Sequence, residues 1–322
     1  MSPYCDRYGG LALNATIDRY ATATVGPGAR RFTVRSIDYD ATLVYGVDDP
    51  FVFDGQLDLA KGVLHWFRQT HSIPDGREVL IHNDAPPGSG LGSSSAVAVA
   101  LVGAMAHSLQ VEPRGAAALA RLAWQVERVD VGILGGRQDH YASAFGGLNF
   151  MEFRRDGTTI VDAVQLEPDI LFELEYSTVL VYVGGIRFSA QILKQQMASA
   201  ERGVDACVRA MHRLKSLTVE MKQALVSGEI RRFGALLDEA WAQKKQMANG
   251  ISTPAIDALY SDAKQAGALG GKVSGAGGGG FMFFLCDARR RFHVQDAARR
   301  HGAQIVPFRF VNAGVQVWTA RT

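Results

Sequence analysis

The chain has 322 residues, of which 47% are hydrophobic and 20% charged, with 34 Lys and Arg against 32 Asp and Glu. This length suits two domains, and the composition excludes a disordered, collagenous or coiled-coil protein. Because the formal net charge is only +2, no field of one sign points to nucleic acid or to an anionic membrane, and we expect a small-molecule partner.

The cysteines indicate neither a disulfide framework nor a zinc site, because Cys5, Cys207 and Cys286 are odd in number, far apart and without Cys-x-x-Cys spacing. We therefore expect a reducing, cytoplasmic location. Residues 85–111 carry no charge, but the apolar centre of this segment is short and rich in alanine, which favours a buried helix over a membrane span. The first seven residues lack the features of a signal peptide.

The first half of the chain predicts strands, a glycine loop and two helices. Residues 77–83 are β-rich and residues 93–109 are apolar almost all round, so a strand, a loop and a buried helix follow in order. Residues 115–130 predict a second helix with one apolar stripe. Further strands are expected at residues 147–153, 158–164 and 177–183.

The second half predicts three or four helices between residues 189 and 265. Two strand regions, residues 272–286 and 304–310, then surround a helix near residues 289–300. This indicates a second α+β layer. The domain boundary lies near residue 175 but is not marked by a linker, and we expect a cleft between the two halves.

Glycine is in excess, at 35 of 322 residues, against roughly 7% in average proteins. The first dense cluster, residues 86–96, reads Pro-Pro-Gly-Ser-Gly-Leu-Gly-Ser-Ser-Ser-Ala and leads into the predicted buried helix. A helix N-terminus behind such a loop binds phosphate, and small hydroxyls can reach a Mg²⁺ ion between two phosphates. No Lys follows the last glycine, so this is not a Walker A motif. The alternative is a tight turn with a serine N-cap.

The second cluster, residues 270–280, reads Gly-Gly-Lys-Val-Ser-Gly-Ala-Gly-Gly-Gly-Gly. A dinucleotide fingerprint is a weak interpretation, because a strand-like segment, Phe281 to Leu285, follows in place of a helix. We expect a glycine loop that lines a site beside the first cluster, with a flexible hairpin as the alternative.

Two carboxylates are candidates for phosphoryl-transfer chemistry. Glu127 falls late in the second predicted helix, and Asp139 follows Gly-Gly-Arg-Gln. Mg²⁺ prefers hard oxygen ligands, and a fixed carboxylate can orient or deprotonate an accepting hydroxyl. The alternatives are a solvated helix face for Glu127 and a turn for Asp139.

Taken together, the two glycine loops and the Glu-x₁₁-Asp spacing between them resemble the GHMP kinase superfamily. Residues 2–10, residues 14–18, Gln138-Asp139 and Trp241 with Lys244-Lys245 are similar to its heptose 7-phosphate kinases. The resemblance covers essentially the whole chain. It implies an α+β fold, with a domain like domain 2 of ribosomal protein S5 over residues 1–175 and a ferredoxin-like domain over residues 176–322.

The resemblance also implies roles for individual residues. Ser94 and Glu127 would hold Mg²⁺, and Asp139 would face the sugar hydroxyl. Gly275, Ala276, Gly277 and Gly278 would complete the wall over the transferring phosphate and the acceptor. The residues that would bind the ATP phosphates are Pro87, Gly88, Gly90, Leu91, Gly92, Ser93, Ser94 and Ser95.

The expected activity is ATP-dependent phosphorylation of the anomeric hydroxyl of D-glycero-α-D-manno-heptose 7-phosphate to the 1,7-bisphosphate, for nucleotide-activated heptose synthesis. One alternative is another GHMP sugar 1-kinase, such as a fucokinase-like enzyme. Another is a catalytically silent nucleotide- or sugar-binding protein. We expect no nucleic-acid or membrane partner, and a homodimer is an open alternative to a monomer.

A 7-phosphate acceptor requires cations at the far end of its pocket. Arg187 is the first candidate, because it precedes a helix start near Ser189 and a guanidinium can bind phosphate bidentately. Lys194, Lys244 and Lys245 are the others, with solvated surface charge as the alternative for most of them.

The resembled kinases begin with a strand and a Gly-Gly-Gly-Thr-Asp segment that contacts the acceptor, whereas this sequence begins just after that point. We expect that the translation start of this sequence has been placed too far downstream, after the codons for that segment. The missing strand would leave an open sheet edge beside residues 10–17 and lower both stability and activity.

Overall fold

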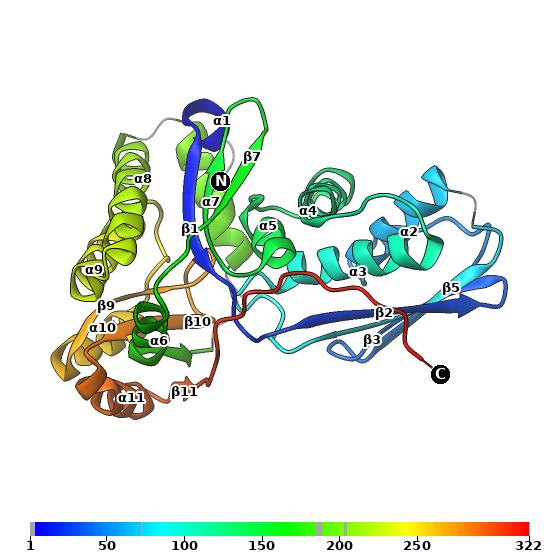
Figure 1. Cartoon of the computed structure of the whole chain (residues 1–322). Coiled ribbons are helices and arrows are strands. Elements are labelled where there is room, and N and C mark those ends of the chain that lie inside the picture. Colours follow the sequence, from blue (N-terminus) through cyan, green and yellow to red (C-terminus); the bar gives the residue numbers. More distant parts are fainter. Residues whose placement is uncertain (1–3, 72, 185–188, 203–204, 322) are drawn as a thin grey trace. The chain divides into compact units, whose positions relative to one another are not determined.

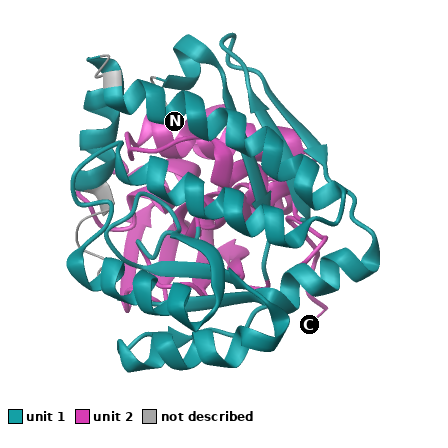
Figure 2. Ribbon diagram, turned by 90° about the vertical axis from the view of Figure 1, so that its left-hand side faces the viewer, with its two compact units in different colours: residues 1–17, 88–91, 147–310 teal, residues 18–87, 92–146, 311–322 magenta. Residues whose placement is uncertain are grey.

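The structure, a computed structural model, describes residues 4–71, 73–184, 189–202 and 205–321. Helices and largely antiparallel sheets form two units, each built from separate segments of the chain (Figure 2). Unit 1 contains residues 1–17, 88–91 and 147–310, and unit 2 contains residues 18–87, 92–146 and 311–322. The α+β class is thereby confirmed. The predicted domain boundary at residue 175 remains a prediction.

Unit 2 is a four-stranded sheet covered by helices (Figure 1). The strand order is β2-β5-β3-β4, and only the pair β3 and β5 is parallel. Its strands are β2 (Ala21–Gly28), β3 (Arg31–Ser36), β4 (Ala41–Gly46) and β5 (Gly76–Asn83). Its helices are α2 (Asp58–Thr70), α3 (Ser93–Leu109), α4 (Ala116–Trp124) and α5 (Gln138–Phe145), with a π-helical turn at Gln125–Asp130.

Period-two alternation explains which face of this sheet is covered. Phe32 and Val34 of β3 are fully buried, whereas Arg31 and Arg35 point outward. Helix α3 packs on β2 and on the other three helices, so it lies at the centre of the unit. No described helix is long and apolar enough to cross a membrane.

Unit 1 contains two antiparallel sheets, ordered β1-β6-β7 and β11-β8-β10-β9. The first consists of β1 (Gly10–Ala15), β6 (Leu148–Phe153) and β7 (Thr159–Ala163). The second consists of β8 (Thr178–Tyr182), β9 (Ala268–Val273), β10 (Phe281–Cys286) and β11 (Gln304–Ile305). The helices are α1 (Tyr4–Tyr8), α6 (Pro168–Ser177), α7 (Ser189–Glu201), α8 (Asp205–Val226), α9 (Ile230–Lys245), α10 (Pro254–Ala266) and α11 (Arg291–Arg300), the last after a 3₁₀ turn at Ala288–Arg290.

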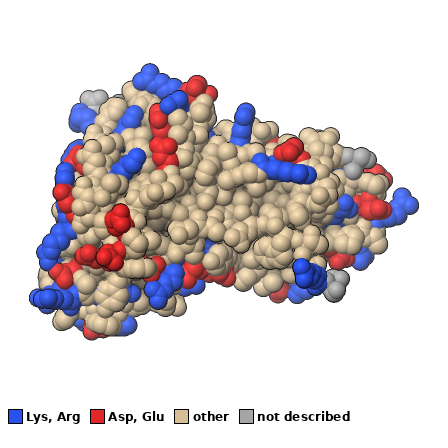
Figure 3. All heavy atoms as spheres, viewed as in Figure 1, with Lys and Arg blue, Asp and Glu red and all other residues tan. Residues whose placement is uncertain are grey.

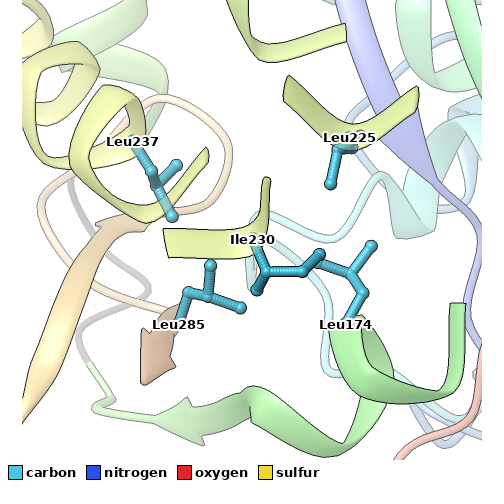
Figure 4. Close-up of a cluster of buried hydrophobic side chains, with 5 residues drawn as sticks. All are labelled: Leu174, Leu225, Ile230, Leu237 and Leu285. Carbon is cyan, nitrogen blue, oxygen red and sulfur yellow. The ribbon is translucent and has the colours of Figure 1, made fainter. Parts of the chain in front are cut away.

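A leucine-rich core holds unit 1 together. Figure 4 shows its buried members, Leu174, Leu225, Ile230, Leu237 and Leu285. Glycines bring α9 and β9 unusually close, because a Cβ atom on Gly270 would lie 2.2 Å from the carbonyl oxygen of Gly234. This contact holds the first half of α9 against β9, at the start of the second glycine cluster.

The strongest sequence patterns correspond to elements of the structure. The strand at 77–83, the buried helix at 93–109 and the helices after residue 189 are confirmed. The strand expected over residues 304–310 is wrong in extent: it covers only Gln304–Ile305, and Phe310 forms an isolated bridge with Ile17. On the face shown in Figure 3, cationic and anionic side chains are interspersed.

Candidate active site

The first glycine cluster connects β5 to α3 through a backbone that only glycine adopts readily. Gly88, Gly90 and Gly92 have φ angles of 72°, 87° and 76°. Helix α3 begins at Ser93 with Gly92 as its N-cap, so no serine side chain caps it. The first helical hydrogen bond runs from Ala96 N to Gly92 O at 3.0 Å. The amides of residues 93–95 therefore precede the helical ladder, as in anion-binding helix starts.

Two serines at the start of α3 are bound to Glu127. The Ser94 hydroxyl donates to Glu127 Oε1 at 2.5 Å, and the Ser95 hydroxyl donates to Oε2 at 3.0 Å. Glu127 is fully buried, so the solvated helix face considered for it is wrong. The cause is the π-helical turn, in which Val131 N donates to Val126 O five residues back. Such a turn shifts the helical phase and rotates Glu127 inward.

Two basic side chains beside Glu127, His140 and Arg128, were not predicted from the sequence. His140 Nε2 lies 2.5 Å from Glu127 Oε2, without the alignment of a hydrogen bond, and the His140 side chain is fully buried. Arg128 Nη2 lies 3.5 Å from the same oxygen and donates to Ser95 Oγ at 3.2 Å. Burial opposes ionisation of Glu127, but His140, Arg128 and Ser94 together lower the pKa of this carboxyl below its ordinary value.

Asp139 lies in the first turn of α5, beside the start of α3. A Cβ atom on Gly92 would lie 3.0 Å from Asp139 Cβ, so the absence of a side chain at position 92 permits this approach. The Asp139 carboxylate has no hydrogen-bond partner among the described residues. Burial, with a smaller contribution from Glu127, raises the pKa of this carboxyl, although His140 and Arg128 oppose the change.

The second glycine cluster packs backbone to backbone against residues 88–91 within unit 1. A Cβ atom on Gly275 would lie 2.7 Å from Gly90 Cα, and Phe281 N donates to Ser89 O at 2.9 Å. The two glycine clusters are therefore neighbours at these residues. Gly275 has a φ of 64°, which again favours glycine.

The other predicted wall residues are held by α7 and by the loop before α10. Ala276 O accepts a hydrogen bond from Gln196 Nε2 at 2.9 Å. Cβ atoms on Gly277 and Gly278 would lie 2.8 Å from Ile251 O and 2.5 Å from Ile192 Cδ1. These contacts hold residues 276–278 against α7 and the loop before α10. A substrate-binding role for these residues remains a prediction.

The predicted phosphate-binding residues are divided between the units. Gly88, Gly90 and Leu91 belong to unit 1, whereas Pro87 and the residues from Gly92 to Ser95 belong to unit 2. Their role in nucleotide binding remains a prediction.

The four candidate cations for a distal phosphate have different surroundings. Arg187 lies outside the described residues. Lys194 is exposed and lines a groove on α7. Lys245 is exposed and pairs with Asp257 at 3.2 Å. Lys244 donates to Val273 O at 3.1 Å and to Gly275 O at 2.6 Å.

Comparison with known proteins identifies the family. Residues 58–147 match the N-terminal domain of the GHMP kinases, and residues 221–304 match their C-terminal domain. A D-glycero-alpha-D-manno-heptose 7-phosphate kinase of Campylobacter jejuni is 34% identical over 317 residues, which cover 98% of this chain and 93% of that protein.

Two further relatives carry the names of different activities. The crystal structure of a D-glycero-D-manno-heptose 1-phosphate kinase from Bacteroides thetaiotaomicron is 33% identical, with a TM-score of 0.80, and the match covers 99% of this chain and 94% of that one. A bifunctional fucokinase/GDP-fucose pyrophosphorylase of Arabidopsis thaliana is 26% identical over 262 residues, which cover 80% of this chain and 24% of that protein.

The match to both GHMP kinase domains and the identity over almost the full length of the Campylobacter protein agree with the order of the motifs in this sequence. The chain belongs to the GHMP kinase family.

Proposed function

We propose that the protein transfers the γ-phosphoryl group of ATP to the anomeric hydroxyl of D-glycero-α-D-manno-heptose 7-phosphate. The observation that carries this proposal is the contact of Gly92 with Asp139, which sets a carboxylate without a hydrogen-bond partner against the end of the phosphate loop. Kinases of this family use ATP, and in-line transfer requires an acceptor hydroxyl that is oriented beside the nucleotide phosphates.

Asp139 would accept the proton of the sugar hydroxyl. As the anomeric oxygen bonds to the γ-phosphorus, the bond from that phosphorus to the β,γ-bridging oxygen breaks, and ADP leaves. Deprotonation requires the ionised carboxylate. The raised pKa of Asp139 makes that carboxylate a stronger base than an exposed aspartate.

The donor set around Glu127 fits a Mg²⁺ ion. Ser94 and Glu127 offer hard oxygen atoms, and the lowered pKa of Glu127 keeps its carboxylate ionised. The described residues contain no group of three or more His, Cys, Asp and Glu side chains that could hold a metal alone. The ligand set would therefore include phosphate oxygens and water, as is usual for Mg²⁺, and the bound ion would neutralise phosphate charge.

The acceptor is proposed from the relatives. The Campylobacter protein carries the name of a 7-phosphate kinase, and the Bacteroides protein that of a 1-phosphate kinase. These names place the phosphate at opposite ends of the sugar. Both proteins match almost the whole chain, at 34% and 33% identity, so these matches do not decide between the two positions. We favour the 7-phosphate because residues 2–10 and 14–18 resemble the heptose 7-phosphate kinases. The similarity to a fucokinase keeps another sugar 1-kinase as the alternative.

Release of ADP with a panel of acceptors tests this function. The panel contains heptose 7-phosphate, heptose 1-phosphate, unphosphorylated heptose and fucose, and we expect turnover only with the 7-phosphate. ADP formation with another member would reassign the acceptor. Ligand-induced stabilisation without ADP formation from any sugar would indicate a silent binding protein.

A cytoplasmic location is part of the proposal, supported by the buried thiols of Cys207 and Cys286, which form no disulfide. A homodimer is proposed as an alternative to a monomer, and sedimentation of the purified protein distinguishes the two states.

A further inference from the structure

Lys272 is a lysine without a counterion among the described residues, near the start of the second glycine cluster. It lies in β9, is partly buried, and its ammonium group has neither a hydrogen bond nor an ion pair among the described residues. Buried or partly buried charges are normally paired, because removal from water destabilises the ionised form. This lysine therefore stands out from those nearby.

The contact between α9 and β9 places Lys272 near a second cation. Gly270 meets Gly234 and Asp238 of α9, and residues two apart in a strand share a face, so Lys272 also faces α9. Farther along α9, Lys244 donates to the carbonyl oxygens of Val273 and Gly275. Helix and strand run side by side here (Figure 1). The ammonium groups of Lys244 and Lys272 therefore both lie near the start of the second glycine loop.

The electrostatics of this pair are unfavourable without an anion. Burial lowers the pKa of Lys272, and burial together with the charge of Lys272 lowers the pKa of Lys244 well below its ordinary value. The same stretch of α9 contains another donor without an acceptor, because Trp241 is 1% exposed and its Nε1 has no partner among the described residues. Lys264 is different: it reaches β9 from α10 and pairs with Asp238 at 3.1 Å and Leu269 O at 2.7 Å.

We propose that Lys272, with Lys244 beside it, forms a binding site for a phosphate group at the entrance of the second glycine loop. The inference rests on the proposed kinase function, because such an enzyme binds two phosphate-bearing ligands. The chemistry is that of a phosphate oxyanion, which comes either from ATP or from the sugar acceptor. In this arrangement Lys244 orders the loop through its carbonyl oxygens, and Lys272 supplies the charge that the phosphate neutralises.

The test compares Lys272→Met with Lys272→Arg and with Lys264→Met as the matched control. Binding of a non-hydrolysable ATP analogue, tripolyphosphate, heptose 7-phosphate and unphosphorylated heptose is measured by calorimetry. We expect Lys272→Met to lower the binding affinity for at least one phosphate ligand by about tenfold to a hundredfold. Lys272→Arg should retain most of the affinity, and Lys264→Met should leave it unchanged.

The pattern of loss identifies the source of the phosphate. A loss for the ATP analogue and tripolyphosphate assigns the site to the nucleotide, and a loss for heptose 7-phosphate but not heptose assigns it to the acceptor. Unchanged affinity for every phosphate ligand would overturn the proposal. If the wild-type protein forms no ADP with any sugar, the proposed function fails, whereas the binding measurements with all three phosphate ligands still decide the anion site.

The melting temperature of the ligand-free protein shows whether Lys272 binds phosphate or only stabilises the fold. Lys272→Met should keep or raise the melting temperature of the ligand-free protein, because no native partner is lost and repulsion with Lys244 is removed. Lys264→Met should lower it, because Asp238 loses an ion pair. A clear fall in the melting temperature for Lys272→Met would contradict the proposal.

Discussion

At the scale of single residues, the proposal depends most on Asp139. Asp139→Asn keeps the shape of the side chain but removes the group that accepts the proton. We expect kcat to fall by about 10²- to 10⁴-fold, with affinity for an ATP analogue unchanged. Single-turnover ADP formation and calorimetry measure the two quantities. Near-native turnover in this variant would remove Asp139 from the role of base.

The same variant makes a prediction about stability. Because the folded-state pKa of Asp139 is raised, this group stabilises the fold at pH values below its unfolded-state pKa, and that contribution disappears as the pH rises through the folded-state pKa. Ionisation of this carboxylate therefore costs the fold stability. Asp139→Asn should melt at an equal or higher temperature than wild type at pH 7, which also shows that lost activity is not lost folding.

Glu127 and Ser94 are expected to act through Mg²⁺. Ser94→Ala leaves Ser95, Arg128 and His140 in contact with Glu127, so the fold should lose only about 1 kcal/mol. The Mg²⁺ concentration for half-maximal rate should rise. Glu127→Gln should raise it further, but should also destabilise the fold by about 3–5 kcal/mol, because the buried Arg128 loses its anion. An unchanged Mg²⁺ titration in Ser94→Ala and Glu127→Gln would exclude this role.

The pH dependence of stability has the opposite sign at Glu127. Its folded-state pKa lies below the ordinary value of 4.5, so its contribution is present above that pH and is lost as the pH falls through the lowered pKa. Melting of wild type should therefore decline below about pH 4.5, and Glu127→Gln should decline less steeply over the same range.

At the scale of elements, Gly92 couples the start of α3 to α5. Gly92→Ala combines an unfavourable φ with a Cβ contact of 3.0 Å to Asp139, whereas Gly132, with a φ of 80°, has nothing within 4 Å of its Cβ position. Both alanine variants should lose about 1 kcal/mol of stability from the backbone. Only Gly92→Ala should also lower kcat, by at least about tenfold, because it displaces the base. Equal kcat in the two variants would show that the contact has no role.

How much of each element the sequence predicts depends on the strength of its pattern. The strand, loop and helix around the first glycine cluster are predicted well, because apolar runs and glycines mark them directly. The strands β2, β3 and β4 were not predicted, and α2 was missed as well. In α2, Lys61 is fully buried and paired with Asp58, which interrupts the expected apolar stripe.

The candidate site shows the same limit. Ser94, Glu127 and Asp139 are suggested by residue type and family resemblance, but the π-helical turn that rotates Glu127 inward leaves no mark in the periodicity of residues 115–130. Arg128 and His140 directly follow Glu127 and Asp139 in the sequence. Adjacency was the only signal available for them, and it does not predict which carboxylate a buried basic side chain contacts.

At the scale of the whole molecule, the interleaved segments make a prediction about autonomous folding. A fragment of residues 176–322 lacks the sheet β1-β6-β7 and helix α6, all of which belong to unit 1. In the intact chain β1 packs against α8, and Leu174 of α6 belongs to the buried core with Leu225 and Leu285.

This fragment, expressed alone, should therefore expose apolar core surface. We expect non-cooperative melting and rapid proteolysis, whereas the intact chain melts cooperatively. A second fragment, residues 147–310, keeps β6, β7 and α6 and omits only residues 1–17 and 88–91 of unit 1, so it should resist proteolysis better. Cooperative unfolding of residues 176–322 alone would show that the predicted domain boundary is also a folding boundary, and that the contacts of α8 with β1 are dispensable.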